Sequence, residues 1–151
     1  SSDGSPETAG LRADPGQGKL QFQDPEEDRL DPAFRQSLLA ASAQLGRPLY
    51  ITDGFRDPNA GYGAKDSFHK RGMAADISMR GMSTEERRDL VEALIDNGVT
   101  RFALYSNTEH LHADVGGRDI HFMYDNGPGN ATVRNMAQAP SWAQDLWRKY
   151  S

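Results

Sequence analysis

The stretch that decides the fold reads Ser67-Phe68-His69-Lys70-Arg71-Gly72-Met73-Ala74-Ala75-Asp76. A second stretch, further along the chain, reads Glu109-His110-Leu111-His112-Ala113-Asp114. Together they supply a histidine, an aspartate seven residues later and, after an intervening helix, a Glu-x-x-His motif. Two imidazoles and one carboxylate suit a tetrahedral Zn²⁺ whose fourth position is open to water, and a further carboxylate suits a general base that acts on that water. The pattern therefore predicts a zinc hydrolase.

The second stretch alternates polar and apolar residues, as a half-buried strand does. One face of such a strand carries His110, His112 and Asp114, and the other carries Leu111, Ala113 and Val115. A face with two imidazoles and a carboxylate does not suit a core, so we expect it to line a cleft. The alternative is that the four histidines of the chain are scattered and each only hydrogen-bonds a carboxylate. The occurrence of both motifs in this order favours the metal site.

Composition excludes several kinds of protein and of site. The net charge is −5 and no long Lys/Arg run is present, which argues against nucleic-acid binding. The absence of cysteine excludes disulfides, thiolate zinc sites and cysteine nucleophiles. No apolar stretch approaches the length of a membrane span, so we expect no span. The 151 residues suffice for one domain with a real core.

The first 28 residues are rich in Gly, Pro, Ser, Asp, Glu and Gln, and carry few large apolar side chains. Such a segment buries too little surface to offset the entropy lost on ordering. We therefore expect residues 1–28 to form a flexible tail or linker, whose end Leu20, Phe22 and Leu30 pin to the domain, and residues 29–151 to form the folded domain.

Helix signals alternate with short apolar runs over the rest of the chain. Asp31-Pro32 begins a helix that Gly46 ends, Ser83 with Glu86 forms a capping box for a second helix, and Ser141 caps a third. Strands are expected at residues 49–52, 73–79, 101–105, 111–115 and 120–124. This order predicts an α+β domain with a small antiparallel sheet flanked by helices.

The two motifs also resemble those of a known family. Ser-x-His-x-x-Gly-x-Ala-x-Asp followed by Glu-x-x-His is similar to the pattern of the zinc D-Ala-D-Ala carboxypeptidases and L-alanyl-D-glutamate endopeptidases, which cut peptidoglycan stem peptides. Asp53-Gly54-Phe55-Arg56 resembles the Ser-Gly-Tyr-Arg segment of that family. The resemblance spans roughly residues 31–124. It implies the zinc fold shared with the hedgehog signalling domain, and a zinc peptidase domain over residues 29–151.

The resemblance also assigns roles to residues. It implies that His69, Asp76 and His112 bind Zn²⁺ and that Glu109 is the catalytic base. Asp114, two residues after the last ligand, is expected to orient that ligand through a hydrogen bond.

Three further residues complete the expected site. Arg56 matches the arginine that binds a substrate carboxylate or steadies the developing oxyanion, and Ser67 matches the serine beside the first ligand. His110 departs from the carboxypeptidase pattern, and His110-x-His112 resembles the His-x-His of the wider group, where the first histidine assists the transition state. Either Glu109 or His110 is therefore a candidate base. We favour Glu109 because a carboxylate beside Zn²⁺ stays ionised.

The implied substrate is a peptidoglycan stem peptide, cut either at a terminal D-Ala or inside the stem. This substrate implies a periplasmic, extracellular or cell-wall location, or a phage-encoded endolysin, and we expect a monomer. Because the chain begins Ser-Ser, we expect a processed or trimmed form. Two alternatives stay open. The domain is a catalytically inactive zinc module that binds peptidoglycan or protein, or it is a component of a phage particle.

Overall fold

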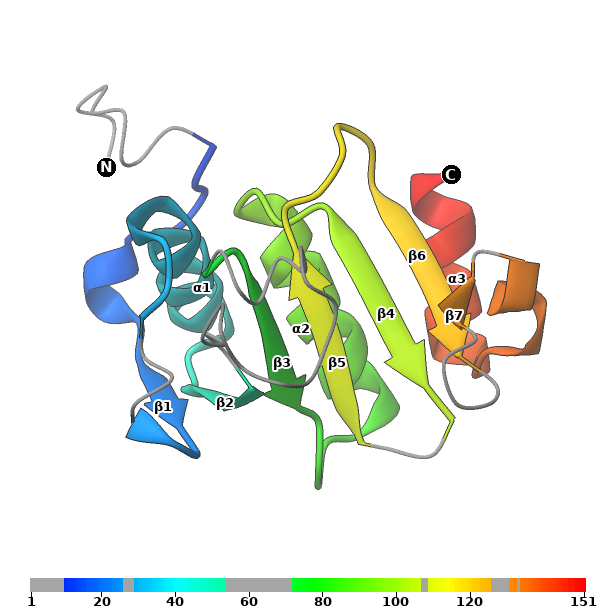
Figure 1. Cartoon of the computed structure of the whole chain (residues 1–151), viewed down its shortest axis with the longest axis horizontal. Coiled ribbons are helices and arrows are strands. Elements are labelled where there is room, and N and C mark those ends of the chain that lie inside the picture. Colours follow the sequence, from blue (N-terminus) through cyan, green and yellow to red (C-terminus); the bar gives the residue numbers. More distant parts are fainter. Residues whose placement is uncertain (1–9, 26–28, 54–71, 107–108, 126–130, 133) are drawn as a thin grey trace, which may run out of the picture.

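A computed structural model describes residues 10–25, 29–53, 72–106, 109–125, 131–132 and 134–151. The helices of this part of the chain are α1 (Pro32–Leu45), α2 (Thr84–Asp96) and α3 (Ser141–Tyr150), with short 3₁₀ turns η2 (Pro15–Gln17) and η5 (Arg134–Gln138) (Figure 1). The strands are β1 (Leu20–Phe22), β2 (Leu49–Asp53), β3 (Ala74–Ser78), β4 (Arg101–Tyr105), β5 (His110–Asp114), β6 (His121–Asp125) and β7 (Ala131–Thr132).

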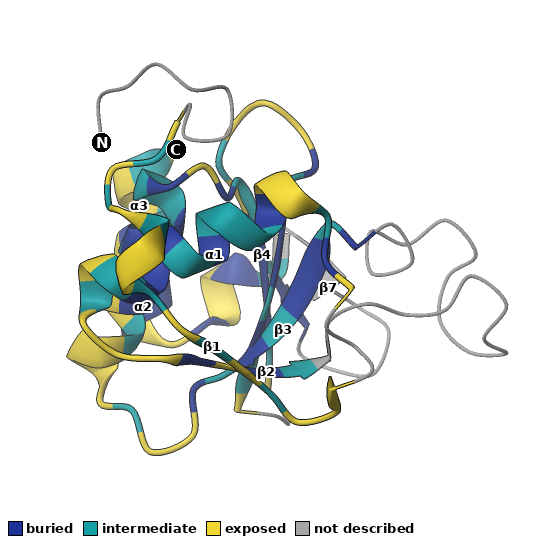
Figure 2. Ribbon diagram, turned by 90° about the vertical axis from the view of Figure 1, so that its left-hand side faces the viewer, coloured by how far each residue is buried: buried dark blue, intermediate teal, exposed yellow. Residues whose placement is uncertain are grey.

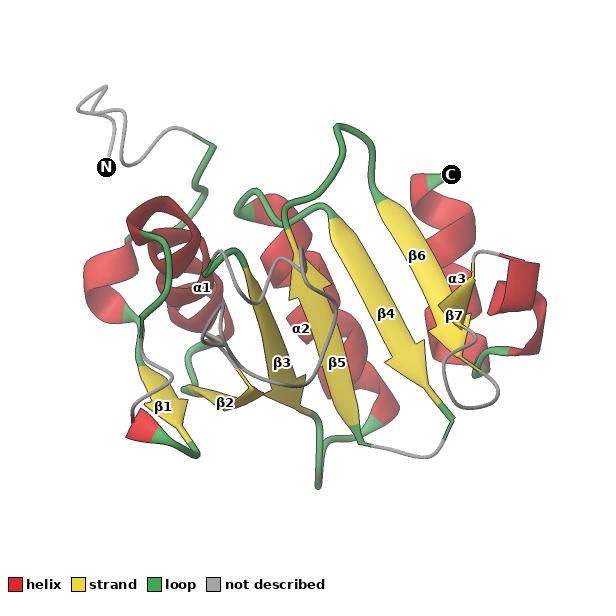
Figure 3. Cartoon of the chain, viewed as in Figure 1, coloured by secondary structure: helices red, strands yellow, loops and turns green. Residues whose placement is uncertain are grey.

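The described strands form one seven-stranded sheet in the order β1-β2-β3-β5-β4-β6-β7 (Figure 3). Helices with a sheet confirm the mixed class predicted from the sequence, but the prediction of a small antiparallel sheet is wrong. Strands β2, β3, β5 and β4 pair antiparallel, whereas β1 runs parallel to β2, and β6 runs parallel to β4. Alternation along a strand shows which face is buried and says nothing of the direction of its neighbour, which the connections set.

Helices α1 and α2 begin at their expected capping residues. The expected cap of α3 is wrong, because Ser141 is the first residue of that helix, follows Pro140 and makes no capping hydrogen bond. The Asp31 side chain accepts a hydrogen bond from the Phe34 amide, and Gly46 ends α1 in the left-handed region with a φ of 71°. Ser83 and Glu86 form the expected capping box of α2. In the part of the chain that the structure describes, no helix has the length and hydrophobicity needed to cross a bilayer.

The core lies between the helices and one face of the sheet (Figure 2). Its fully buried side chains include Leu38 of α1, Leu90 and Leu94 of α2, Ile77 of β3 and Leu111 of β5. Because successive strand residues point to opposite faces, burying Ile77 and Leu111 turns Asp76 and His112 to the face away from the helices. The apolar packing of the core thus orients the polar residues of both sequence motifs.

The expected tail boundary at residue 28 is wrong, because residues 10–25 pack on the domain. Strand β1 pairs with β2, and the half-buried Leu20 and Phe22 contact the core. The amide of Lys19 donates to Ser42 Oγ at 2.9 Å. At Gly18, a Cβ atom would lie 1.8 Å from the Leu39 carbonyl oxygen, so only glycine allows this approach to α1.

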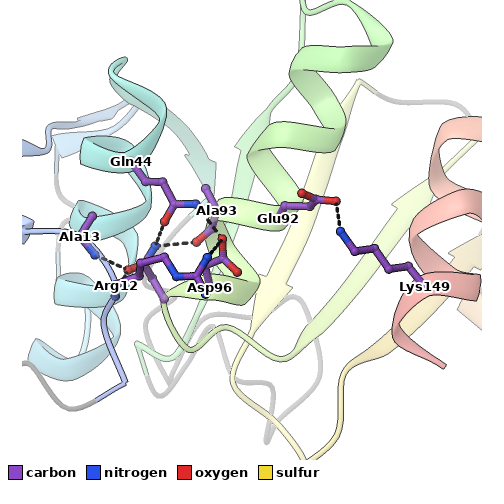
Figure 4. A network of polar contacts seen from close by, with 8 residues as sticks. Arg12, Ala13, Gln44, Glu92, Ala93, Asp96 and Lys149 are labelled. Atoms are coloured by element: carbon purple, nitrogen blue, oxygen red, sulfur yellow. Dashed lines mark hydrogen bonds and ion pairs between the residues drawn. The ribbon is translucent and has the colours of Figure 1, made fainter.

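The start of this segment is tied to the end of α2 by Asn97, which is fully buried. Its side-chain oxygen accepts hydrogen bonds from the amides of Arg12 and Ala13 at 2.7 and 3.1 Å. Its amide nitrogen donates to Gln44 of α1 at 3.0 Å and to the Ala93 carbonyl at 2.7 Å (Figure 4). The buried Asn97 side chain therefore joins the N-terminal segment, α1 and the end of α2.

A truncation tests this corrected boundary. A chain that begins at Arg29 loses β1 and the burial of Leu20 and Phe22, a loss of roughly 2–4 kcal/mol of unfolding free energy. We expect its melting temperature to lie about 10 °C below that of a chain that begins at Gly10. Thermal denaturation followed by circular dichroism measures both. Equal melting temperatures would show that residues 10–25 do not stabilise the domain.

Candidate active site

The sheet face away from the helices brings two of the predicted zinc ligands together. Asp76 of β3 lies directly opposite His112 of β5 in the antiparallel register. His112 Nδ1 is 3.2 Å from Asp76 Oδ1. His69, Arg56 and Ser67 lie outside the described residues, so the third predicted ligand and both predicted substrate-binding residues have no position here.

His112 is held from its other side by Asp114. His112 Nε2 is 2.7 Å from Asp114 Oδ2, which is the hydrogen bond expected from the sequence. The Asp114 side chain is only 1% exposed, and its Oδ1 accepts the Gly116 amide at 2.8 Å and lies 2.9 Å from Arg101 Nε. Burial would raise the pKa of Asp114, but the hydrogen bonds from His112 and Gly116, together with the His112 and Arg101 charges, lower it.

The two carboxylates also act on the imidazole. Burial alone would lower the pKa of His112, yet its hydrogen bonds to Asp114 and Asp76 and their negative charges raise the pKa to about 9. The two carboxylates therefore favour a positive charge at His112. Either a second proton on the ring or a metal ion bound to it can supply that charge.

The arrangement of Asp76 and His112 fits a zinc ion. With bonds of about 2.0–2.1 Å, the edge of a tetrahedral site is about 3.3–3.4 Å long, close to the 3.2 Å between His112 Nδ1 and Asp76 Oδ1. A zinc-bound imidazole usually donates its other N–H to a carboxylate, and Asp114 stands in that place. Among the described residues, no three His, Cys, Asp or Glu side chains form a metal group, and the predicted third ligand, His69, is not one of them.

The two candidate bases lie in different surroundings. His110 Nε2 is 3.8 Å from Asp76 Oδ2, so β5 brings this imidazole next to the ligand pair. Glu109 precedes β5, and its half-exposed carboxylate lies 3.4 Å from Arg80 Nε and 3.9 Å from Arg87 Nη2. In the described contacts, His110 is thus the nearer of the two to the predicted ligands, while Glu109 is engaged by arginines.

Tyr105 of β4 also lies at the site, beside His110. Its ring centroid is 5.4 Å from that of His110. Burial and the negative charges of Asp76, Asp125 and Asp114 raise the pKa of Tyr105 to about 12, so the phenol keeps its proton. Alternation along β4 places Tyr105 on the same face as Arg101, and this period-two pattern is the sequence signal that could have found it.

A cleft of about 800 Å³ opens beside these residues and includes both candidate bases. The described residues that line it are Gln23, Tyr50, Thr52, Ser78, Arg80, Ser106, Glu109 and His110. Tyr50, on β2, is 44% exposed. The cleft therefore extends from the β1–β2 side of the sheet to the start of β5, with polar walls and one exposed aromatic ring.

A comparison with protein families agrees with this geometry. The family model described as Peptidase M15 matches residues 9–114, more than half of the chain. The chain belongs to the peptidase M15 family. This confirms the resemblance inferred from the motifs, and membership implies a peptidase with a peptide substrate. Neither a curated protein nor a solved structure matches this M15 chain significantly.

The raised pKa of His112 predicts how the stability of the chelator-treated protein depends on pH. The folded pKa of about 9 exceeds the unfolded value near 6.5, so the stabilising contribution is complete below about pH 6.5. It is lost as the pH rises through 9, and we expect the free energy of unfolding to fall by on the order of 2 kcal/mol. The lowered pKa of Asp114 keeps that carboxylate ionised throughout this range.

Urea denaturation at pH 6, 7.5 and 9 in the presence of a chelator measures the effect. The variant His112→Gln keeps a polar side chain without the titration, and we expect its stability to change much less over the same range. An equal decline in both proteins would show that His112 does not cause it.

Proposed function

We propose that the chain is a zinc-dependent peptidase that hydrolyses the stem peptides of peptidoglycan, as a D,D-carboxypeptidase or as an L-Ala-D-Glu-type endopeptidase. The cross-strand pair of Asp76 and His112, backed by Asp114 in a chain of the peptidase M15 family, is the observation that carries this proposal. The substrate places the protein at the bacterial cell wall, in the periplasm or outside the cell, or makes it a phage-encoded endolysin.

The metal would be held by His69, Asp76 and His112. A bound Zn²⁺ would polarise the scissile carbonyl and lower the pKa of the attacking water. The chain prepares two of these ligands in advance, because Asp114 fixes the His112 ring and the strand register fixes Asp76 beside it. Little reorganisation is then needed for these two groups when the ion binds.

Glu109 would accept the proton of the attacking water and pass it to the leaving amine. Its ion pair with Arg80 joins two exposed side chains, and such pairs contribute only about 0–1 kcal/mol, so the carboxylate can leave it for the substrate. His110, beside Asp76, would donate a hydrogen bond to the developing oxyanion, and Arg56 would do the same or bind a substrate carboxylate. Ser67 would contact the substrate next to the first ligand.

The cleft provides the place for the peptide. It has room for several residues of an extended chain, and its serine, threonine and glutamine side chains can hydrogen-bond a peptide backbone of either chirality. Because Glu109 and His110 line the same cleft, a peptide lying there reaches both candidate bases.

One observation favours a second candidate, a zinc-containing module that binds peptidoglycan or protein without catalysis. Among the residues that the structure describes, the ion pairs of the Glu109 carboxylate are with Arg80 and Arg87. If these ion pairs persist when substrate is bound, the base is withheld from the reaction.

Two variants separate the enzyme from the binding module. Glu109→Gln keeps size and polarity but cannot take a proton, so we expect it to retain one zinc per chain and to lose about 10²–10⁴-fold in turnover. His110→Ala should lose less, since it removes a hydrogen-bond donor and leaves the base. Elemental analysis gives the zinc content, and mass spectrometry of muropeptides digested with and without a chelator gives the activity.

The outcomes differ sharply. Near wild-type cleavage by Glu109→Gln, with His110→Ala inactive, would assign the base to His110. Zinc binding by the wild-type chain without cleavage of any muropeptide would support the binding module. A wild-type chain without zinc would refute both zinc-dependent readings.

The cleft makes a further prediction about Tyr50. Its half-exposed ring can pack on a bound peptide, and removal of such an aromatic contact costs roughly 0.5–1.5 kcal/mol. We expect Tyr50→Ala to raise KM by about 2- to 12-fold with little change in kcat, because the contact exists before and during the reaction. Tyr150→Ala, on α3, is the matched aromatic control. An unchanged KM for Tyr50→Ala would place the peptide elsewhere.

A further inference from the structure

We infer that Arg101 is a positioning residue for the metal site, acting through Asp114 on the ring of His112. The inference rests on the proposed function, because it takes His112 to be a metal ligand. It extends the site to a residue of β4 whose described contact is with Asp114, and to Gly116, which lies against the guanidinium.

The contacts form a line across the three strands β4, β5 and β3. Arg101 is the cross-strand partner of Asp114, and its Nε lies 2.9 Å from Oδ1 and 3.1 Å from Oδ2 of that carboxylate. Asp114 Oδ2 in turn meets His112 Nε2 at 2.7 Å. His112 Nδ1, on the far side of the ring, faces Asp76. A shift of the Arg101 guanidinium would therefore move the Asp114 carboxylate and change the orientation of the His112 ring.

The burial of Asp114 makes it dependent on this arginine. With 1% of its side chain exposed, the carboxylate has almost no water to stabilise its charge. An ionised group in such a place needs charged or hydrogen-bonding partners within the protein. When a metal ion occupies Nδ1, the His112 ring is neutral and supplies only an N–H, so Arg101 then supplies the positive charge.

Gly116 provides the space for the guanidinium. A Cβ atom at this position would lie 2.8 Å from Arg101 Cζ and 3.0 and 3.1 Å from its two terminal nitrogens. The backbone of Gly116 has no positive φ, so the glycine matters here for room and not for conformation, because a Cβ would displace the end of the Arg101 side chain. The amide of Gly116 also donates to Asp114, and its carbonyl accepts from Thr100 Oγ1 at 3.2 Å, which fixes the loop beneath the arginine.

This arrangement matters for metal binding because a neutral imidazole carries its proton on one ring nitrogen and can bind a metal only through the other. Nδ1 is free to bind a metal when the ring proton is on Nε2, and a carboxylate that accepts from Nε2 selects that form. Asp114 does so only while it stays ionised and in place. The Gly116 amide holds the carboxylate at Oδ1, and Arg101 Nε contacts both of its oxygens.

The test compares the zinc affinity of the purified wild-type chain and five variants by competition with a chromogenic chelator at 20 °C. Loss of a residue behind a metal ligand typically weakens binding about 10- to 100-fold. We expect Asp114→Asn to fall in that range and Arg101→Met to lose about tenfold. Gly116→Ala retains the charge and the amide donor but displaces the guanidinium, so we expect a smaller loss of about threefold.

The variant Arg118→Met is the matched control. Arg118 is an exposed arginine that lines the same hollow of about 260 Å³ as Arg101 and Gly116, so this variant removes one positive charge from the same end of the sheet. We expect its zinc affinity to equal that of the wild type. A loss equal to that of Arg101→Met would show that only the overall charge matters and would overturn the inference.

Thermal denaturation of the same proteins separates positioning from general stability. A merely structural arginine would lower the melting temperature and leave the zinc affinity of the folded protein unchanged, and that result overturns the inference. Arg101→Lys supplies the charge with a different geometry, and we expect it to recover part of the affinity lost in Arg101→Met. A wild-type chain that binds no zinc would refute the proposed function itself, whereas tight wild-type binding with unaffected Arg101→Met and Gly116→Ala refutes this inference alone.

Discussion

The pairing of β3 with β5 determines the places of His110 and of the two predicted zinc ligands that the structure describes. Their antiparallel register sets Asp76 opposite His112 and Ser78 opposite His110. A shift of one residue would turn the imidazoles toward the helices and bring Leu111 to the open face. The full burial of Leu111 and Ala113 opposes that shift, because both side chains would lose their contacts in the core. The chemistry of the open face thus depends on hydrophobic packing behind it.

Electrostatics on the open face follow from this placement. Three carboxylates, Asp76, Asp114 and Asp125, lie close enough to Tyr105 to raise its pKa, and two of them raise that of His112. Such a concentration of negative charge is costly without compensation. Arg101 compensates part of it from the end of the sheet at which β5 finishes. A divalent cation at His112 and Asp76 would compensate more, which is consistent with a site formed in advance of its metal.

Sequence patterns predicted the parts of the structure that depend on local interactions. Asp31, Gly46 and the Ser83–Glu86 box set the ends of helices, and alternation at residues 110–114 gave the correct buried face. The parts that were missed depend on contacts between distant segments. The polar composition of the first 28 residues gave no sign of β1. This strand is held by its pairing with β2 and by the close approach of the preceding Gly18 to α1. The place of Tyr105 likewise depends on β4 lying next to β5, a pairing that no local pattern specifies.

Asn97 gives the N-terminal segment a role in the order of folding. Its bonds to the amides of Arg12 and Ala13 span 85 and 84 residues of sequence. Closing so long a loop costs entropy before any contact compensates for it, and folds rich in such distant contacts form slowly. Helix α2 ends at Asp96, so the acceptor for this segment exists only after that helix has formed. The segment that contributes β1 should therefore dock after α2 has formed, and until it does, the outer edge of β2 is open to strands of other molecules.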